Sequence, residues 1–307
     1  HAWHRTNSVG FYTAMTVLPR LVKTMPQLSA RSTTDSVEQL QDFLTAHPCT
    51  MVITGAGISH GSGIPTYRDH VGTWKSNIPI QHADFIRAHT TRQRYWARSF
   101  SGWPTIDNAK PNGAHHSLAK LEELGYVSLL VTQNVDRLHQ KAAQKRVIDL
   151  HGRLDEVICL DCGEIHTRAW VQSWLQQHNP HLKQSSDSIR PDGDADVPDE
   201  LVAAVKVPQC GQCGGIIKPN VVFYGASVDK EVVNEIEQRL KFVESLLIVG
   251  SSLMVYSSYR FCKFAAQHKI PMACINEGLT RADDLFTIKV AADCVSTLEY
   301  LEKSFAN

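Results

Sequence analysis

The sequence carries no net charge and has no long apolar run. Its 307 residues include 31 basic and 31 acidic side chains, so no overall field attracts the chain to nucleic acid or to an anionic membrane. No apolar stretch approaches the length of a transmembrane helix, which is about 20 residues. We therefore expect neither a membrane span nor a nucleic-acid partner. The length suits one large domain or two unequal ones.

Acidic residues are absent from residues 1–34, where four basic residues lie among hydroxyl and apolar side chains. A basic, hydroxyl-rich and acid-poor segment is typical of a mitochondrial presequence, and a disordered tail is the alternative. The folded part is expected to begin at Asp35 or Ser36, either of which suits the N-cap of a helix.

The eight cysteines do not form the framework of a secreted disulfide protein, because four of them lie in two C-x-x-C pairs. Two such pairs predict a structural zinc site, and a redox dithiol is the alternative. Four thiolates leave no open position for water, so this metal is expected to hold structure and not to take part in chemistry. The predicted ligands are Cys159, Cys162, Cys210 and Cys213. The remaining four fit no ligand pattern and are expected to be buried thiols or, for Cys294, a loop residue.

Apolar runs alternate with amphipathic stretches along the chain, as in a doubly wound α/β fold. Buried parallel strands are predicted at 127–133, 245–250 and 271–276, and helices at 115–125, 230–243 and 259–268. Polar or glycine-containing segments follow these strands and would line one ligand crevice at their carboxyl ends. Residues 153–218 interrupt the alternation, contain both cysteine pairs and an acidic loop, and are predicted to form a small inserted module.

The glycine-rich stretch MVITGAGISHGSGIPTYRDH, residues 51–70, lacks two parts of a dehydrogenase fingerprint. The pattern G-x-G-x-x-G requires a third glycine where His60 stands. Residues 70–83 also contain no Asp or Glu to bind an adenosine ribose. A phosphate-cradling loop after a buried strand is therefore expected, but a dehydrogenase is not.

Taken together, the motifs GAGISHGSGIPTYR, TQNVD, LHG, the two C-x-x-C pairs, KPNVVFYG, GSSL and IN occur in the order and spacing of the sirtuins over residues 36–300. The sequence is identified as a member of that family. The stretches PIQHADFIR, RQRYWARSF and RADDLF resemble its class II branch, closest to mitochondrial sirtuin 4. The resemblance implies an α/β fold with a Rossmann-type NAD-binding domain at 35–152 and 219–307, and a zinc-binding module at 153–218.

In this family NAD is a co-substrate, cleaved to nicotinamide while the acyl group of a lysine passes to ADP-ribose. The resemblance implies that His151 is the general base, and that Asn134 and Asp136 complete the catalytic set. It assigns cofactor contacts to residues of the glycine-rich loop, TQNVD and the later strand ends: Gly55, Ala56, Gly57, Ile58, Ser59, Ile64, Pro65, Tyr67, Arg68, Gln133, Asn134, Asp136, Gly250, Ser251, Ser252, Asn276, Glu277 and Cys294.

The acyl pocket is expected to contain Tyr95, Arg98, Val222 and Phe223. Tyr95 and Arg98 are spaced i and i+3, and they match a Y-x-x-R pair that a related mitochondrial sirtuin uses for succinyl and malonyl groups. An arginine there would bind an acyl carboxylate. A solvated basic helix is the alternative reading of this stretch.

The implied function is an NAD-dependent lysine deacylase, of a lipoamidase or an acidic or branched-acyl type. Its expected partners are acylated lysines of metabolic enzymes in the mitochondrial matrix. Two alternatives use the same NAD residues: a protein mono-ADP-ribosyltransferase, and a low-turnover NAD-binding regulator. His60, Gly61 and Asn220 depart from the usual family pattern and predict altered rate or specificity.

Overall fold

The structure is a computed structural model that describes residues 34–66, 79–183 and 197–306. Tyr67, Arg68 and most of the acidic loop at 191–200 lie outside these ranges. In the described ranges, every helix is too short or too polar to cross a bilayer.

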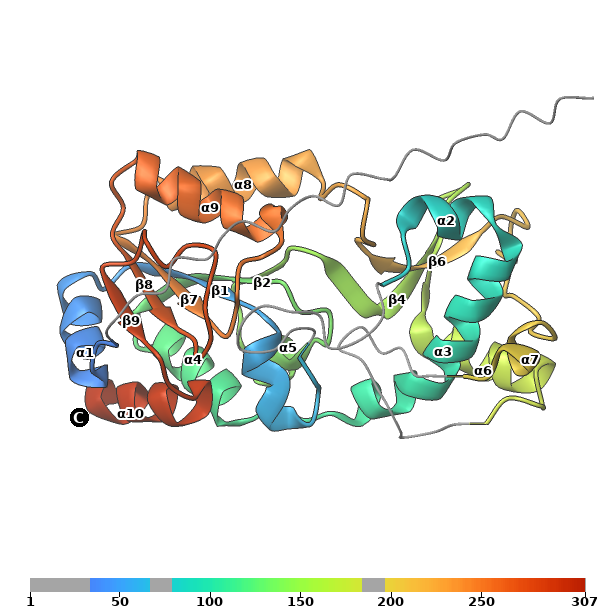
Figure 1. Cartoon of the computed structure of the whole chain (residues 1–307), viewed down its shortest axis with the longest axis horizontal. Helices are drawn as coiled ribbons and strands as arrows, with labels where there is room; N and C mark the ends of the chain where they lie inside the picture. Colours follow the sequence, from blue (N-terminus) through green and yellow to red (C-terminus); the bar gives the residue numbers. More distant parts are fainter. Residues whose placement is uncertain (1–33, 67–78, 184–196, 307) are drawn as a thin grey trace, which may run out of the picture.

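A parallel six-stranded sheet forms the larger half of the molecule, in the order β3-β2-β1-β7-β8-β9 (Figure 1). Its strands are β1 (Thr50–Thr54), β2 (Val127–Thr132), β3 (Val147–Asp149), β7 (Ser245–Val249), β8 (Met272–Ile275) and β9 (Ile288–Val290). Every residue of β1, β7 and β8 is buried, as expected of strands covered by helices on both faces. The doubly wound parallel sheet is confirmed.

Helices cover both faces of this sheet, so its strands are enclosed in two apolar cores (Figure 1). On one face lie α1 (Val37–Ala46), α4 (Gly113–Glu123) and α10 (Cys294–Ala306), and on the other α8 (Lys230–Leu240) and α9 (Tyr256–Gln267). Ser36 caps α1 in a capping box with Gln39, as expected from the sequence. Cys294 begins α10 and is buried, so its expected place in a loop was wrong.

The zinc module contains a separate antiparallel sheet, in the order β5-β4-β6. Its elements are β4 (Gly152–Cys159), β5 (Ile165–Thr167), α6 (Arg168–His178), α7 (Asp199–Val202) and β6 (Ile217–Val221). Two helices from earlier in the chain, α2 (His82–Arg87) and α3 (His89–Asn108), supply Phe85, Tyr95 and Trp96 to the same core. This core therefore extends beyond the 153–218 segment, and the exact domain boundaries stay a prediction.

The order of the large sheet reverses at β1, because the chain runs outward through β2 on one side and through β7 on the other. Ligands of such sheets bind outside the carboxyl ends of the strands at this reversal. The segments that leave β1, β2 and β7 are η1 (Ala56–Ser62), the loop into α5 (Leu138–Lys141), and the loop into α9. These three segments carry most of the predicted cofactor residues.

Candidate active site

A cavity of about 600 Å³ lies at the carboxyl ends of the central strands, between the sheet and the zinc module. Its polar wall comes from the loops after β1, β2 and β3, and its apolar wall from α3, β4 and the segment after β6. The predicted site residues among its lining are Ala56, Ser59, Ile64, Tyr95, Gln133, Asn134, Asp136, His151, Val222 and Phe223. The structure thus brings together the proposed catalytic groups and three of the four acyl-pocket residues.

His151 lies in the turn between β3 and β4, and both of its ring nitrogens have partners. Nδ1 is 3.1 Å from the backbone carbonyl of Gln133, and Nε2 is 2.8 Å from the Ser257 hydroxyl. A carbonyl only accepts hydrogen bonds, so Nδ1 carries the proton and Nε2 accepts from Ser257. Burial lowers the pKa of His151, against the opposing effect of the Gln133 carbonyl. Nε2 is therefore a neutral, proton-accepting nitrogen at the cavity wall near pH 7.

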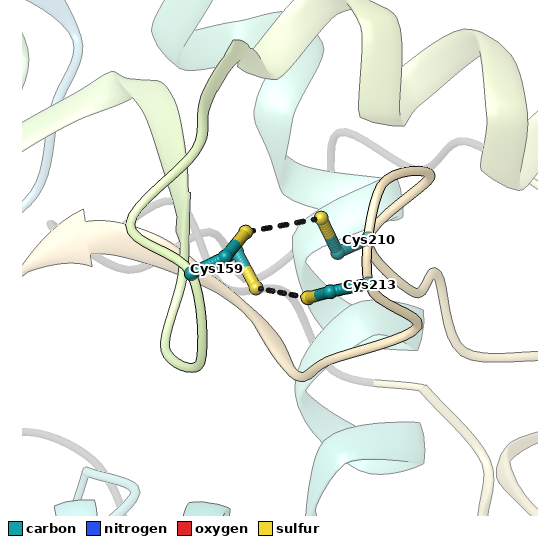
Figure 2. Close-up of side chains that lie close together, drawn as sticks. Cys159, Cys210 and Cys213 are labelled. Atoms are coloured by element: carbon teal, nitrogen blue, oxygen red, sulfur yellow. Dashed lines mark hydrogen bonds between the residues drawn. The ribbon is translucent and has the colours of Figure 1, made fainter.

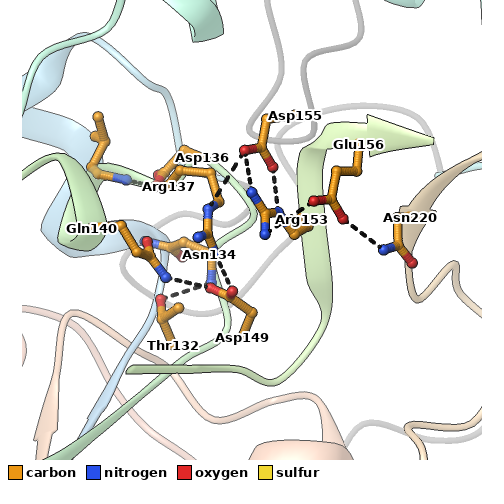
Figure 3. A network of polar contacts seen from close by, with 11 residues as sticks. Thr132, Asn134, Asp136, Arg137, Gln140, Asp149, Arg153, Asp155, Glu156 and Asn220 are labelled. Carbon is orange, nitrogen blue, oxygen red and sulfur yellow. Dashed lines mark hydrogen bonds and ion pairs between the residues drawn. The ribbon is translucent and has the colours of Figure 1, made fainter. Parts of the chain in front are cut away.

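An ion-pair network holds the turn that carries His151 (Figure 3). Arg137 pairs with Asp149 at the end of β3 and lies 3.8 Å from the carboxylate of Asp155 on β4. Arg153 binds Asp155 with two hydrogen bonds of 2.6 Å. Because these groups flank His151 on both sides in the sequence, the network fixes the backbone from which the imidazole projects.

Asp136 is buried next to Ser59, and its carboxylate accepts hydrogen bonds from the Ser59 hydroxyl at 2.7 Å and from the Leu138 N–H at 2.9 Å. Burial raises the pKa of this carboxyl in spite of those bonds. The Asn134 amide donates to the Gly55 carbonyl and to the Ser59 hydroxyl, both at 3.0 Å. Asn134 and Asp136 thus connect the loop after β2 to the loop after β1, with their polar atoms at the cavity wall.

The glycines of the first loop pack against the loop after β7. A methyl group on Gly57 would lie 2.8 Å from Cα of Gly250, and one on Gly250 would lie 2.5 Å from the Ile58 nitrogen. Gly250 also has a left-handed φ of 60°. The Gly57 N–H donates to the Gly250 carbonyl at 2.8 Å. These glycines are needed because two backbones touch here, which adds a structural reason to their predicted role near phosphates.

Replacing Gly250 with alanine is expected to lower the free energy of unfolding by about 2–4 kcal/mol, the sum of left-handed backbone strain and overpacking. Gly125→Ala is the matched control, because Gly125 also has a positive φ of 89° but has no atom within 4 Å of an added methyl. That control is expected to cost only about 1 kcal/mol. Urea unfolding of both variants checks the difference, and equal losses would contradict the close packing of the two loops.

Several predicted cofactor residues do not line the cavity. Ile58 is fully buried in the apolar core beneath the sheet, and Cys294 is buried in the same core. Burial raises the pKa of Cys294 to about 12, so it is a neutral thiol. The others outside the lining lie beside it along the same loops or at the end of β8: Gly55, Gly57, Pro65, Gly250, Ser251, Ser252, Asn276 and Glu277. Ser251 is nevertheless tied to the site, since its hydroxyl accepts a 2.7 Å hydrogen bond from Gln133.

The wall of the cavity that is predicted to bind the acyl group is apolar and aromatic. Tyr95 and Phe223 line it with ring centroids 5.3 Å apart, and Phe85 packs against both rings from behind. Ile80 and Leu154 extend this wall. Arg98, the fourth predicted acyl-pocket residue, is half-buried on α3 and is not among the lining residues.

Sequence reasoning missed two segments of the site, the start of α9 and residues 224–228. Tyr256, Ser257 and Arg260 line the cavity together with the segment 224–228. Ser257 is the partner of His151, although the two are 106 positions apart in the sequence. Tyr256 and Ser257 lie only three and four residues after GSSL, and this was the available signal, because residues that follow a strand end at the reversal point reach the same crevice.

The four predicted zinc ligands converge in the module, with all four sulfurs within 4.8 Å of one another (Figure 2). Cys159 and Cys213 are 3.5 Å apart, and Cys162 and Cys210 are 3.7 Å apart. Four thiolates at the usual Zn–S distance of about 2.3 Å would be separated by about 3.8 Å, so the set fits a tetrahedral zinc ion. The backbone N–H of Cys162 helps to lower the pKa of Cys159 to about 7, whereas, against the lowering effect of the backbone N–H of Gly215, the neighbouring thiols raise the pKa of Cys213 to about 12.

Comparison with known proteins agrees with this geometry. The Sir2 family matches residues 55–257. NAD-dependent protein deacetylase 2 of Bradyrhizobium diazoefficiens is 49% identical over 264 residues, which are 86% of this chain and 97% of that protein. The human NAD-dependent protein lipoamidase sirtuin-4, mitochondrial, is 46% identical over 271 residues, which are 87% of this chain and 86% of that protein. A solved structure of Sir2 with a p53 peptide and NAD+ has a TM-score of 0.71 at 29% identity, over 89% of this chain and 99% of that one.

The fold and the site define a Rossmann-type protein that binds NAD as a co-substrate and holds a four-cysteine zinc centre. The chain belongs to the sirtuin (Sir2) family and is an NAD-dependent protein lysine deacylase. Its identities to the bacterial deacetylases and to human sirtuin-4 are comparable, so the family is shown and the sirtuin 4 branch stays a proposal.

Proposed function

We propose that this deacylase removes large, mainly apolar acyl groups of the lipoyl type from lysine side chains. The observation that carries the proposal is the acyl wall of the cavity, where Ile80, Tyr95 and Phe223 present apolar surface. Such a wall gains free energy from each methylene that it covers, about 0.8 kcal/mol, and these three residues carry no charge that would bind an acyl carboxylate. The human relative named as a lipoamidase supports the same substrate class.

We propose the following roles for the polar wall. His151 takes a proton at Nε2 from a ribose hydroxyl once the Ser257 hydroxyl has moved aside. Asn134 and Asp136 bind the nicotinamide ribose and the carboxamide of the nicotinamide ring. Ser59 holds Asp136 in place through the 2.7 Å hydrogen bond. NAD, when bound, supplies the ribose that accepts the acyl group. The apolar wall excludes water from the reacting groups, so that acyl transfer is favoured over hydrolysis of NAD.

A second candidate is an acidic acyl group, and one observation favours it. Nε of Arg98 is buried and has no hydrogen-bond partner among the described residues. A guanidinium in that state gains from a carboxylate if the side chain can turn toward the cavity. Arg98 would need to rearrange first, whereas the apolar wall is already in place, so we rank this candidate second.

The two candidates predict opposite results for lysine peptides that carry acetyl, lipoyl, glutaryl or hydroxymethylglutaryl groups. We expect the lipoyl peptide to have the highest kcat/KM, and Arg98→Ala to change that value by less than about twofold, because Arg98 does not line the cavity. Nicotinamide release and mass spectrometry of the peptides measure it. Fastest turnover of a glutaryl-type peptide, with a loss of about tenfold or more in Arg98→Ala, would replace the first candidate by the second.

We further propose that the protein acts in the mitochondrial matrix on acylated metabolic enzymes. Residues 1–34 contain no Asp or Glu, and the chain is similar to a mitochondrial relative; both observations support this location. Import of a fusion of residues 1–34 to a fluorescent protein tests the location directly. A fusion that stays in the cytosol would count against it.

A further inference from the structure

A second hollow of about 340 Å³ adjoins the cavity along α9, and Tyr256 and Arg260 line both. The other residues around this hollow are Glu237, Lys263, Phe264 and Gln267. Because Tyr256 and Arg260 line both spaces, a polypeptide that places its acyl-lysine in the cavity has a path along this hollow.

Positive charge is concentrated around one exposed ring at this place. Tyr256 is 49% exposed, and its ring centroid is 5.2 Å from the guanidinium of Arg260 and 6.0 Å from the ammonium of Lys263. The guanidinium of Arg281 lies 5.8 Å from the same ring. Three cations beside one ring repel one another, and the π face offsets only part of that repulsion.

The charge is not neutralised by the carboxylates that are near. Glu237 lines the hollow, but neither Arg260 nor Lys263 forms an ion pair with any residue that the structure describes. The charge of Asp284 acts on Tyr259, and the guanidinium of Arg281 lies 4.3 Å from the centroid of the Tyr259 ring. Nε of Arg260 is buried and has no hydrogen-bond partner in the described ranges. A buried guanidinium N–H without an acceptor is costly, and an incoming anion would satisfy it.

We infer that the hollow formed by Tyr256, Arg260 and Lys263 binds an acidic side chain of the substrate polypeptide beside the acyl-lysine. The deacylase would thereby select acylated lysines that lie in acidic segments. A carboxylate there accepts from Arg260 and pairs with Lys263, while its stem lies on the Tyr256 ring. Because this preference is one among substrates of the deacylase, it rests on the deacylase activity.

The test uses acyl-lysine peptides in which Glu or the isosteric Gln occupies each of the four positions on either side of the lysine. At one position or more, the Glu peptide is expected to have a kcat/KM about three- to tenfold higher than that of the matching Gln peptide, because its KM is lower. The preference is expected to shrink as salt is raised, because Lys263 is exposed. NAD titrations with each peptide separate this effect from any change in co-substrate binding.

Lys263→Glu is the deciding variant, because Lys263 does not line the catalytic cavity. It is expected to keep its turnover of Gln peptides, to lose the preference for Glu, and to favour a Lys peptide at the same position. Lys241→Glu is the matched control, because it changes the net charge by the same amount. Lys241 follows α8 and precedes the amino end of β7, so this variant is expected to keep the preference for Glu. Equal kcat/KM for Glu and Gln peptides in the unaltered protein would overturn the inference. No nicotinamide release with any peptide would instead overturn the deacylase assignment.

Discussion

Replacing His151 with alanine is expected to lower acyl-peptide-dependent nicotinamide turnover by about 10²- to 10⁴-fold, the usual contribution of a general base. The structure supplies three reasons. The ring lines the cavity, its tautomer is set by the Gln133 carbonyl, and Nε2 is hydrogen-bonded to Ser257, which also lines the cavity. Binding of NAD is expected to change little, because the loops that follow β1 and β7 remain intact. Steady-state turnover and a thermal-shift titration with NAD measure the two effects separately.

The pH dependence of turnover tests the role of His151 independently. A base must be neutral to accept a proton, so activity is lost as pH falls through the pKa of His151. Burial lowers that pKa below the usual 6.5, and the acid limb should therefore lie below that value. His178→Ala is the control, since His178 is an exposed residue of α6 that stacks on Trp174. Full activity of His151→Ala, or an acid limb well above pH 6.5, would contradict the assigned role.

The sequence indicated the local parts of this molecule well. Strands at 127–133, 245–250 and 271–276 agree with β2, β7 and β8 to within one residue at each end. Ser36 was recognisable as a helix N-cap because capping depends on neighbours in the sequence. The four zinc ligands were found by spacing, since each pair lies on one short turn.

The contacts between distant segments were not predictable in the same way. The pairing of His151 with Ser257, and of Gln133 with Ser251, depends on which strands become neighbours in the sheet. Arg98 illustrates the same limit: it shares a helical face with Tyr95, yet of the two only Tyr95 lines the cavity, and a role for Arg98 in the acyl pocket stays a prediction. Periodicity gives the face of a helix, but tertiary packing decides which part of that face reaches a site.

Removing the zinc ion is expected to disable the enzyme without touching a catalytic residue. Cys159 and Cys210 belong to the apolar core of the module, and the same core contains Tyr95 and has Phe223 packed against it. Structural zinc contributes about 10–16 kcal/mol to the folding of small zinc domains, far more than one side chain in this core. The cavity wall and the metal site are therefore expected to be lost together.

Cys210→Ser, or a strong chelator added to the unaltered protein, is expected to lower the thermal unfolding midpoint by at least about 10 °C and to abolish turnover. Metal analysis should give one zinc per chain before treatment, which also distinguishes this site from a redox dithiol. Cys49→Ser is the matched control, because Cys49 is half-buried at the far end of β1 and belongs to no group of converging ligands in the described residues. It is expected to keep its zinc and its activity. A metal-free protein with an unchanged midpoint would show that the module is stable without the metal, and the structural role of zinc would then be wrong.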